Sequence, residues 1–524
     1  MSLPMATPVP SAPDHPPVGG DPEAPAGVAR SGGGPVDGLF AAAFGLVGLA
    51  LGARPIGDNS TFVHLRTGVD ILAGKGLPRV DPYSATAAGA KWVVQSWLPA
   101  VAYGLAQRID GDGRVLLVLN GALTALLALL VHRLARADSP LRTLGAGLVA
   151  VAVSGPWWSP RPLLVGLACL ALTILVVEGG RRPWLLLPVA WVWVNSHGSF
   201  PLGALWLLAT AIGCAVDERR LVTARFRAGL WFAGGLVLAC VNPLGPRLLL
   251  FPLAVGNRRE IFRHISEWRP ANFQSVPGIV AAVGLAVAVV LLSRRRVAWV
   301  AAVPAGVFVL LGLVAQRNLA PAGIVLAPAL GLALSRPREP ADEAADEQAE
   351  EQVEERAEEQ AEGHPQEPEP AGSGPRPSAE GRRHRLLGAL VGLVALGLVA
   401  NAISSGSLDL EAYPVEVVEA GERLGAFAPG QLVATQDTVG CYLILRRGRN
   451  ARVFIDDRYD MYPLRLSLDY VDLLRARPGA VEILERRGVD AVLWDRSLPL
   501  VPALEERGWR ETAGDKTWVL LQHP

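Results

Sequence analysis

The chain has 524 residues, of which 51% are hydrophobic and 19% are charged. This balance is too apolar for a soluble protein of such length and indicates a polytopic membrane protein. The 49 basic residues are offset by 49 acidic ones, so no basic excess points to nucleic acid, and we expect no nucleic-acid partner.

The N-terminal residues 1–36 are rich in Pro, Gly and Ala and lack the basic-then-apolar order of a signal peptide, so we expect a disordered cytoplasmic tail. A spanning helix needs about 20 mostly apolar residues, and about 17 are tolerated. About eleven stretches approach that length, whereas 93–107 is shorter and more polar and is expected to lie along the membrane interface. The predicted spans are 37–53, 115–135, 141–156, 162–178, 184–195, 199–216, 228–242, 277–293, 297–314, 319–335 and 386–403.

Arginine-rich connections between these stretches predict the orientation, because such connections stay in the cytoplasm. With eleven spans and a cytoplasmic N-terminus, all of them fall on the cytoplasmic side, whereas twelve spans would place them outside. Few lysines beside abundant Ala, Gly, Pro and Arg are typical of a GC-rich bacterial genome. We therefore expect a multi-pass protein of the bacterial cytoplasmic membrane. The connections are 133–142, 181–182, 219–227, 294–296 and 382–385.

The chain divides into a helix bundle at 37–335, with a long first outer loop at 54–113, and a separate C-terminal part. Residues 336–385 run from an acidic block into a Pro/Gly/Ser-rich stretch, which predicts a disordered cytoplasmic linker before the last span. Residues 404–524 return to a soluble composition and are expected outside the cell. Their helical stretches alternate with short β-like runs, which predicts a small α/β domain with a largely parallel sheet. The expected helices are 414–427, 464–476, 478–487 and 499–507, and the expected strands are QLVAT, ARVFID, DAVLWD and TWVLLQ.

Polar and aromatic side chains collect on the predicted outer face, whereas the inner face carries mainly arginine clusters and the acidic linker. Polar groups at membrane depth are costly, so those that occur there are candidates for function. The first outer loop carries Asp58, His64, Arg66 and Asp81, and the later outer loops carry Arg161, His197, Glu267, Trp268, Arg317 and Asn318.

Each of these side chains also has a structural interpretation. Asp58 and His64 suit a solvated loop or a helix cap, and His197 suits a cap for the helix before it. Trp268 lies where interfacial aromatic belts occur, and Arg161 and Arg317 suit anchoring to lipid phosphates.

Together, the outer residues suit sugar transfer from a lipid-linked phosphate. A hydroxyl acceptor needs a general base, most simply a carboxylate such as Asp58 or Asp81. The leaving phosphate gains negative charge, which Arg, protonated His or a metal stabilises. The acids and histidines could also supply ligands for a divalent metal, although no close ligand motif such as HxxxH or DxD is present.

Several stretches of the chain resemble a known family. They are DNSTFVHLRTGVDILAGKGLPRVDPYSAT (58–86), KWVVQSWL (91–98), WSPRP (158–162), WVWVNSHGSFPLG (191–203), ISEWRPANF (265–273), QRNLAPAGIVLAP (316–328), GCYLIL (440–445) and RVFIDDRYDMY (452–462). In order and character they resemble the C-type (GT-C) membrane glycosyltransferases, in particular a bacterial group related to protein mannosyltransferases and dolichyl-phosphate-mannose-type enzymes.

The resemblance implies a polyprenyl-phosphate sugar donor, inversion at the anomeric carbon and a catalytic acid in the first outer loop. By position Asp58 takes the role of that acid. Many members pair it with a second acid, whereas Asn59 follows here, which leaves Asp81 as a candidate second acid or base. The acceptor would be an envelope glycan, lipid or protein.

The densest polar cluster of the C-terminal part follows the expected strand ARVFID and contains Asp456, Asp457, Arg458 and Asp460. Acids at the carboxyl end of a strand in an α/β domain often bind ligands, so this cluster suits the positioning of an acceptor. Ion pairs between Arg458 and its acidic neighbours, holding the domain onto the membrane loops, explain the cluster equally well.

Two other functions remain open beside the glycosyltransferase. A transporter or flippase for a lipid-linked substrate predicts charged or broken segments deep within several spans, whereas the charged residues here lie at span ends and loops. A non-catalytic envelope assembly factor predicts that Asp58→Asn has no effect on activity.

Overall fold

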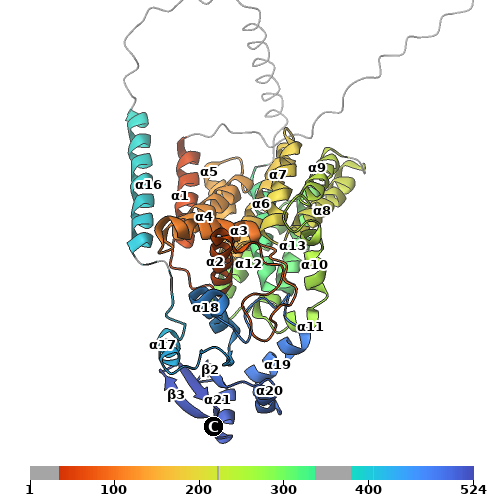
Figure 1. The fold of residues 1–524 in the computed structure, drawn as a ribbon. Coiled ribbons are helices and arrows are strands. Elements are labelled where there is room, and N and C mark those ends of the chain that lie inside the picture. Colours follow the sequence, from red (N-terminus) through yellow and green to blue (C-terminus); the bar gives the residue numbers. More distant parts are fainter. Residues whose placement is uncertain (1–34, 221–222, 337–378, 405, 407, 524) are drawn as a thin grey trace, which may run out of the picture. The chain divides into compact units, whose positions relative to one another are not determined.

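The computed structural model describes residues 35–220, 223–336, 379–404, 406 and 408–523. Nearly all of the tail predicted at 1–36, and most of the linker predicted at 336–385, lie outside these residues. Each predicted apolar stretch coincides with a helix (Figure 1). These helices are α1 (Pro35–Gly52), α4 (Arg114–Leu134), α5 (Pro140–Ser154), α6 (Leu163–Gly179), α7 (Leu186–Ser196), α8 (Pro201–Glu218), α9 (Ala224–Leu238), α12 (Val276–Ser293), α13 (Trp299–Val314), α14 (Leu319–Leu334) and α16 (Ala379–Ser404).

The number of helices that are long and apolar enough to cross a membrane is smaller than predicted. Within the described ranges, 4 helices meet this condition by length and composition, rather than eleven. They are α4, α8, α12 and the helix Gln316–Leu334. Several other predicted spans are helical over too few residues because turns interrupt them. Helix α7, for example, has 11 residues, starts after a short 3-10 turn at Pro183–Leu185 and ends at Ser196.

The predicted first loop is largely helical. Helix α2 (Asn59–Asp70) leads into a π-helical turn at Ile71–Lys75, and α3 (Trp97–Asp110) covers much of the stretch that was expected along the interface. Glycines let α2 and α3 approach closely, because a Cβ at Gly68 would collide with the carbonyl oxygen of Ala100. The C-terminal half of α2 is thereby packed directly against α3.

A second long loop precedes α12. It contains α10 (Arg247–Gly256), the short helix α11 (Arg259–Phe262) and a 3-10 turn at Ser266–Trp268. This turn is tied to the start of α14, because the amide of Gln316 donates to the carbonyl of Arg269 at 2.9 Å.

The C-terminal domain (residues 408–523) contains a four-stranded sheet with helices packed around it. The strands are β1 (Val433–Thr435), β2 (Ala491–Asp495), β3 (Arg510–Gly514) and β4 (Trp518–Gln522), in the order β1-β2-β4-β3. The helices are α17 (Val415–Arg423), α18 (Asp437–Arg447), α19 (Leu464–Leu474), α20 (Ala480–Arg486) and α21 (Leu500–Glu506).

The prediction of a largely parallel sheet is wrong. Only β1 and β2 run parallel, and β4 pairs antiparallel with both β2 and β3. The unpredicted strand β3 forms a hairpin with β4, and the carboxylate of Asp515 closes its turn by accepting the amides of Thr517 and Trp518 at 2.7 Å.

The expected strand ARVFID does not join the sheet. Its Val453 instead pairs with the first loop, accepting the amide of Ala85 at 2.9 Å and donating to the carbonyl of Tyr83 at 3.1 Å. The backbone groups that a sheet neighbour would satisfy are therefore satisfied by the bundle.

The first loop and the C-terminal domain share one hydrophobic core, in which Phe62, Tyr83 and Trp92 pack in the same cluster as Phe454 and Trp494. Helix α18 lies against α2 at this junction, as Figure 1 shows. The domain is therefore packed on the loops that carry the candidate residues.

Candidate functional site

Asp58 lies at the N-terminus of α2, where it is both a helix cap and an ion-pair partner. Its Oδ1 accepts the amide of Thr61 at 3.2 Å, and its Oδ2 lies 2.5 Å from Nε of Arg161. The side chain is 10% exposed, so it does not stand in a solvated loop. The capping role is therefore present, and it leaves the second oxygen for the arginine.

Arg161 connects two carboxylates from different loops. Its Nη1 forms a second, very short hydrogen bond with Glu267, and the hydroxyl of Thr61 ties the Arg161 loop to α2 by donating to the carbonyl of Pro160. Burial disfavours the charged guanidinium, but Asp58 and Glu267 outweigh it and raise the pKa of Arg161 above its ordinary value. The arginine is therefore a fixed cation between two acids.

Two histidines close to this cation are held neutral. Burial, with Arg161 and Arg458 next in effect, lowers the pKa of His64 from 6.5 to about 4. Burial, followed by Arg317, His64 and Arg161, lowers the pKa of His197 to about 3. His197 is the C-cap of α7, because its amide donates to the carbonyl of Trp193 at 2.8 Å, and its Nδ1 atom accepts the amide of Ser199 at 3.2 Å. At neutral pH both rings contribute polarity without charge.

Arg317 faces the same place from the start of α14. Its guanidinium carbon lies 4.5 Å from the centroid of the Trp268 ring, so this tryptophan supports a cation. Glu267 and Arg161 both lie within electrostatic reach of Arg317. In the part of the chain that the structure describes, no carboxylate forms an ion pair with Arg317. The adjacent Asn318 points elsewhere and donates to the carbonyl of Leu311 at 3.1 Å.

Both carboxylate oxygens of Asp81 make hydrogen bonds or ion pairs within the protein. It accepts the amides of Tyr83 at 3.0 Å and Ser84 at 3.1 Å, takes a very short hydrogen bond from the Ser84 hydroxyl, and lies 2.9 Å from Nη1 of Arg458. Its side chain is 0% exposed. A proton acceptor needs an accessible oxygen, so this geometry favours an anchoring role for Asp81.

Arg458 is the counterpart of Asp81 on the C-terminal domain. It also binds Asp456 through two hydrogen bonds of 2.7 Å, and it stacks at 4.5 Å on the ring of Trp92. The hydroxyl of Tyr462 donates to Asp456 at 2.6 Å. These buried contacts match the ion-pair interpretation of the cluster, because they join the domain to the first loop.

The other acids of the cluster behave differently from Asp456. Burial raises the pKa of Asp460 to about 6, against the opposing effect of Arg458. Asp457 accepts a hydrogen bond from Nδ2 of Asn59 at 3.3 Å, so it lies at the start of α2. Asn59, the residue that replaces the second acid of the family pattern, therefore holds an acid from the C-terminal domain.

Arg66 belongs to a separate cluster around Asp70. It lies 3.1 Å from Asp70, which also pairs with Lys75 at 3.0 Å and with Arg449 at 3.5 Å. Asp70 is 1% exposed and accepts the hydroxyl of Tyr83 at 3.3 Å. Sequence analysis did not single out Asp70, although the spacing of four residues from Arg66 on a helix was a signal for this pair.

The described residues contain no group of three or more His, Cys, Asp or Glu side chains placed to hold a metal ion. Asp58 and Asp81 have different partners, so the metal ligands suggested from the sequence do not form one set here.

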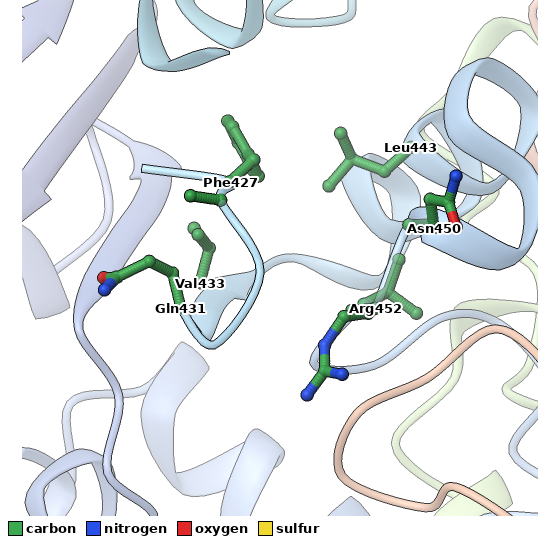
Figure 2. A pocket seen from close by; sticks show the side chains of 9 residues that line it. Phe427, Gln431, Val433, Leu443, Asn450 and Arg452 are labelled. Carbon is green, nitrogen blue, oxygen red and sulfur yellow. The ribbon is translucent and has the colours of Figure 1, made fainter. Parts of the chain in front are cut away.

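Two hollows lie away from these side chains. Figure 2 shows one in the C-terminal domain, between the segment that leads into β1 and the residues after α18, with the guanidinium of Arg452 at its lower edge. The other, of about 270 Å³, lies between α6 and α9 beside Trp231. Neither is lined by a residue predicted for the site.

Comparison with known proteins supports the fold. No family model and no curated protein sequence matches the chain. Among solved structures, the archaeal oligosaccharyltransferase AglB from Archaeoglobus fulgidus, in complex with an inhibitory peptide and a dolichol-phosphate, matches with a TM-score of 0.50 and 11% identity, over 87% of this chain and 69% of that one. ArnT from Cupriavidus metallidurans, bound to undecaprenyl phosphate, matches with a TM-score of 0.44 and 12% identity, over 94% of this chain and 98% of that one.

The AglB match shows that this chain shares the fold of that oligosaccharyltransferase, which agrees with the fold that the sequence motifs implied. The chain is a membrane protein with a helix bundle and a small C-terminal sheet.

Proposed function

We propose that the protein is a membrane glycosyltransferase that moves a sugar from a polyprenyl-phosphate donor to an envelope acceptor. The observation that carries this proposal is the meeting of Asp58, Arg161, Glu267 and Arg317, which come from loops far apart in the chain. Such a grouping combines acids that can take a proton with cations that can bind a phosphate.

The cations suit the donor. A sugar phosphodiester carries one negative charge, and its leaving phosphate gains a second as the glycosidic bond breaks. Arg317 has no carboxylate partner among the described residues and is the free cation for that charge, whereas Arg161 is already shared by two acids. The dolichol-phosphate held by AglB, which shares the fold, is a lipid of the proposed class.

The neutral histidines suit the sugar. An imidazole with a pKa of about 3 or 4 stays uncharged at neutral pH and can exchange hydrogen bonds with sugar hydroxyls without competing for the phosphate. We place His64 and His197 in this role.

Asp58 is the sequence-derived candidate for the general base, and its replacement is expected to lower transfer strongly. In the proposed orientation the N-terminus is cytoplasmic, and the C-terminal domain and the site face outward on the bacterial cytoplasmic membrane.

A transfer assay tests the proposal. The purified full chain in nanodiscs is incubated with radiolabelled undecaprenyl-phosphate hexoses and pentoses and with an envelope fraction as acceptor. Transfer by the wild type, strongly reduced transfer by Asp58→Asn and unchanged transfer by Asp472→Asn are expected. Asp472 provides a matched control, because its ion pair with Arg477 lies on the surface of α19. Lack of transfer with every donor, together with movement of a fluorescent lipid-linked sugar across the bilayer, would instead identify a flippase.

A further inference from the structure

We infer that Asp457 of the C-terminal domain accepts the proton of the acceptor hydroxyl, and that Asp58 acts as a positioning residue for Arg161. This inference rests on the proposed function and specifies which carboxylate does the chemistry. It also makes the C-terminal domain part of the active site.

The position of Asp457 is the first argument. Its Oδ2 receives Nδ2 of Asn59 at 3.3 Å, and Asn59 directly follows Asp58 at the start of α2. A carboxylate from the C-terminal domain is thus placed next to the residue that the family pattern marks as the catalytic acid. Asn59 and Asp457, which form this hydrogen bond, lie 398 residues apart in the chain.

The second argument is the number of contacts that each carboxylate already makes. Asp58 caps α2 with one oxygen and holds Arg161 at 2.5 Å with the other. If Asp58 took a proton, it would weaken its hold on the half-buried Arg161. Asp457 has one hydrogen bond from a side chain, the long one from Asn59, and no ion pair among the described residues. Its other oxygen is therefore available to a hydroxyl.

The rigidity of the surroundings is the third argument. Asp456 and Arg458, on either side of Asp457, are locked together and onto Asp81. The hydroxyl of Tyr459 donates to Asp437 at 2.9 Å, which fixes the chain on the far side of Arg458. A base must be held within a fraction of an ångström of its working position, and these contacts hold the backbone of Asp457 in that way.

The charges around Asp457 support the same role. Burial raises its pKa from 3.8 to about 7, and Asp456, Asp58 and Asp437 act in the same direction, whereas Arg161 opposes them. Cys441, Tyr413 and Tyr459 also lie within electrostatic reach. A base with a pKa near the working pH is the most effective one, and His64 and His197 are far weaker bases.

The step balances in atoms and charge. An oxygen lone pair of the acceptor hydroxyl forms the new bond to the anomeric carbon, and the bond from that carbon to the phosphate oxygen breaks. The electron pair of the broken bond leaves with the polyprenyl phosphate, which becomes a dianion. The hydroxyl proton passes to the carboxylate of Asp457, which later releases it to water.

The test is the pH dependence of kcat/KM for the full chain, with the radiolabelled donor that the wild type accepts. The wild type should gain activity as the pH rises through about 7, because Asp457 must be ionised. Asp457→Asn should lower kcat about 100-fold or more and remove this rise. Asp457→Glu should keep the rise with reduced activity, and Asp58→Asn should lower activity but leave the rise in place.

Folding is monitored by thermal unfolding and gel filtration, with Asp472→Asn as the control for an acid of the same domain. The inference is overturned if folded Asp457→Asn keeps the rise near pH 7, or if Asp58→Asn alone removes it. If the wild type transfers no sugar from any donor, the proposed function fails, a result that is distinct from a retained rise in an active variant.

Discussion

Nε of Arg161 lies 2.5 Å from Oδ2 of Asp58, and this contact joins residues 103 positions apart in the chain. It links the first loop to the loop before α6, and the second contact of Arg161, with Glu267, adds the loop before α12. One guanidinium thus determines how three loops meet.

Replacement of Arg161 by Gln should therefore affect both folding and transfer. Asp58 and Glu267 would face each other without a cation, at side-chain exposures of 10% and 38%. We expect a loss of about 1–3 kcal/mol in unfolding free energy, since the contacts are only partly buried, and loss of detectable transfer. Thermal unfolding in detergent and the transfer assay measure the two effects.

Arg142→Gln is the matched control for this prediction, because Arg142 pairs with Asp138 at exposures of 31% and 35%. It should change stability by about 0–1 kcal/mol and leave transfer intact. Arg161→Lys should recover part of the stability but little transfer, since a lysine cannot hold two carboxylates in the fixed directions of a guanidinium. Full transfer by Arg161→Gln would contradict the site.

A second prediction separates anchoring from chemistry at Asp81. The pair between Asp81 and Arg458 is almost completely buried, at exposures of 0% and 6%. Removing one charge from such a pair costs about 3–5 kcal/mol, so Asp81→Asn should lower the unfolding temperature strongly. Limited proteolysis should then release the C-terminal domain more readily. If Asp81→Asn is as stable as the wild type but inactive, Asp81 takes part in the reaction.

The helical stretches could be predicted from the sequence, because apolar runs are local signals. The number of spans could not, since it depends on where turns cut a run short, as at Pro183 before α7. The direction of the sheet strands was also missed, because RVFID looks like a core strand but pairs with Tyr83 and Ala85 of the first loop. Only the tertiary fold determines such a partner.

For the candidate site, too, the sequence indicated some residues but not the contacts between distant segments. The sequence indicated Asp58, Arg161 and Arg317 through residue type and predicted side. It could not indicate that Asn59 holds Asp457, because the two lie 398 residues apart and no local pattern connects them. The choice between Asp58 and Asp81 as base likewise depends on burial and hydrogen bonding, which appear only after folding.

A third prediction concerns acid stability. Folding lowers the pKa of His64 from 6.5 to about 4, so the folded state binds fewer protons than the unfolded state between these values. The stabilising contribution of neutral His64 is complete above about pH 6.5 and is lost as the pH falls toward 4. His64→Gln removes this dependence. Its unfolding temperature, relative to the wild type, should rise as the pH falls from 6.5 to 4.

Unfolding temperatures at a series of pH values test this expectation. Asp472→Asn should retain the dependence of the wild type. A constant difference between His64→Gln and the wild type at all pH values would show that His64 is not held neutral by the fold.

The last prediction concerns the cation assigned to the donor phosphate. Arg317 stacks on Trp268 at 4.5 Å and has no carboxylate ion pair among the described residues, so its charge contributes little to folding. Arg317→Ala should raise KM for the polyprenyl-phosphate sugar about tenfold or more and lower kcat, because the charge on the leaving phosphate grows during the reaction. Its unfolding temperature should stay close to that of the wild type.

Arg317→Lys keeps the charge but weakens the stacking and should recover part of the donor affinity. Trp268→Leu should act in the same direction as Arg317→Ala but more weakly, since it removes the ring that orients the guanidinium and leaves the charge. Steady-state kinetics with varied donor decide the matter, and an unchanged KM in Arg317→Ala would place the phosphate elsewhere.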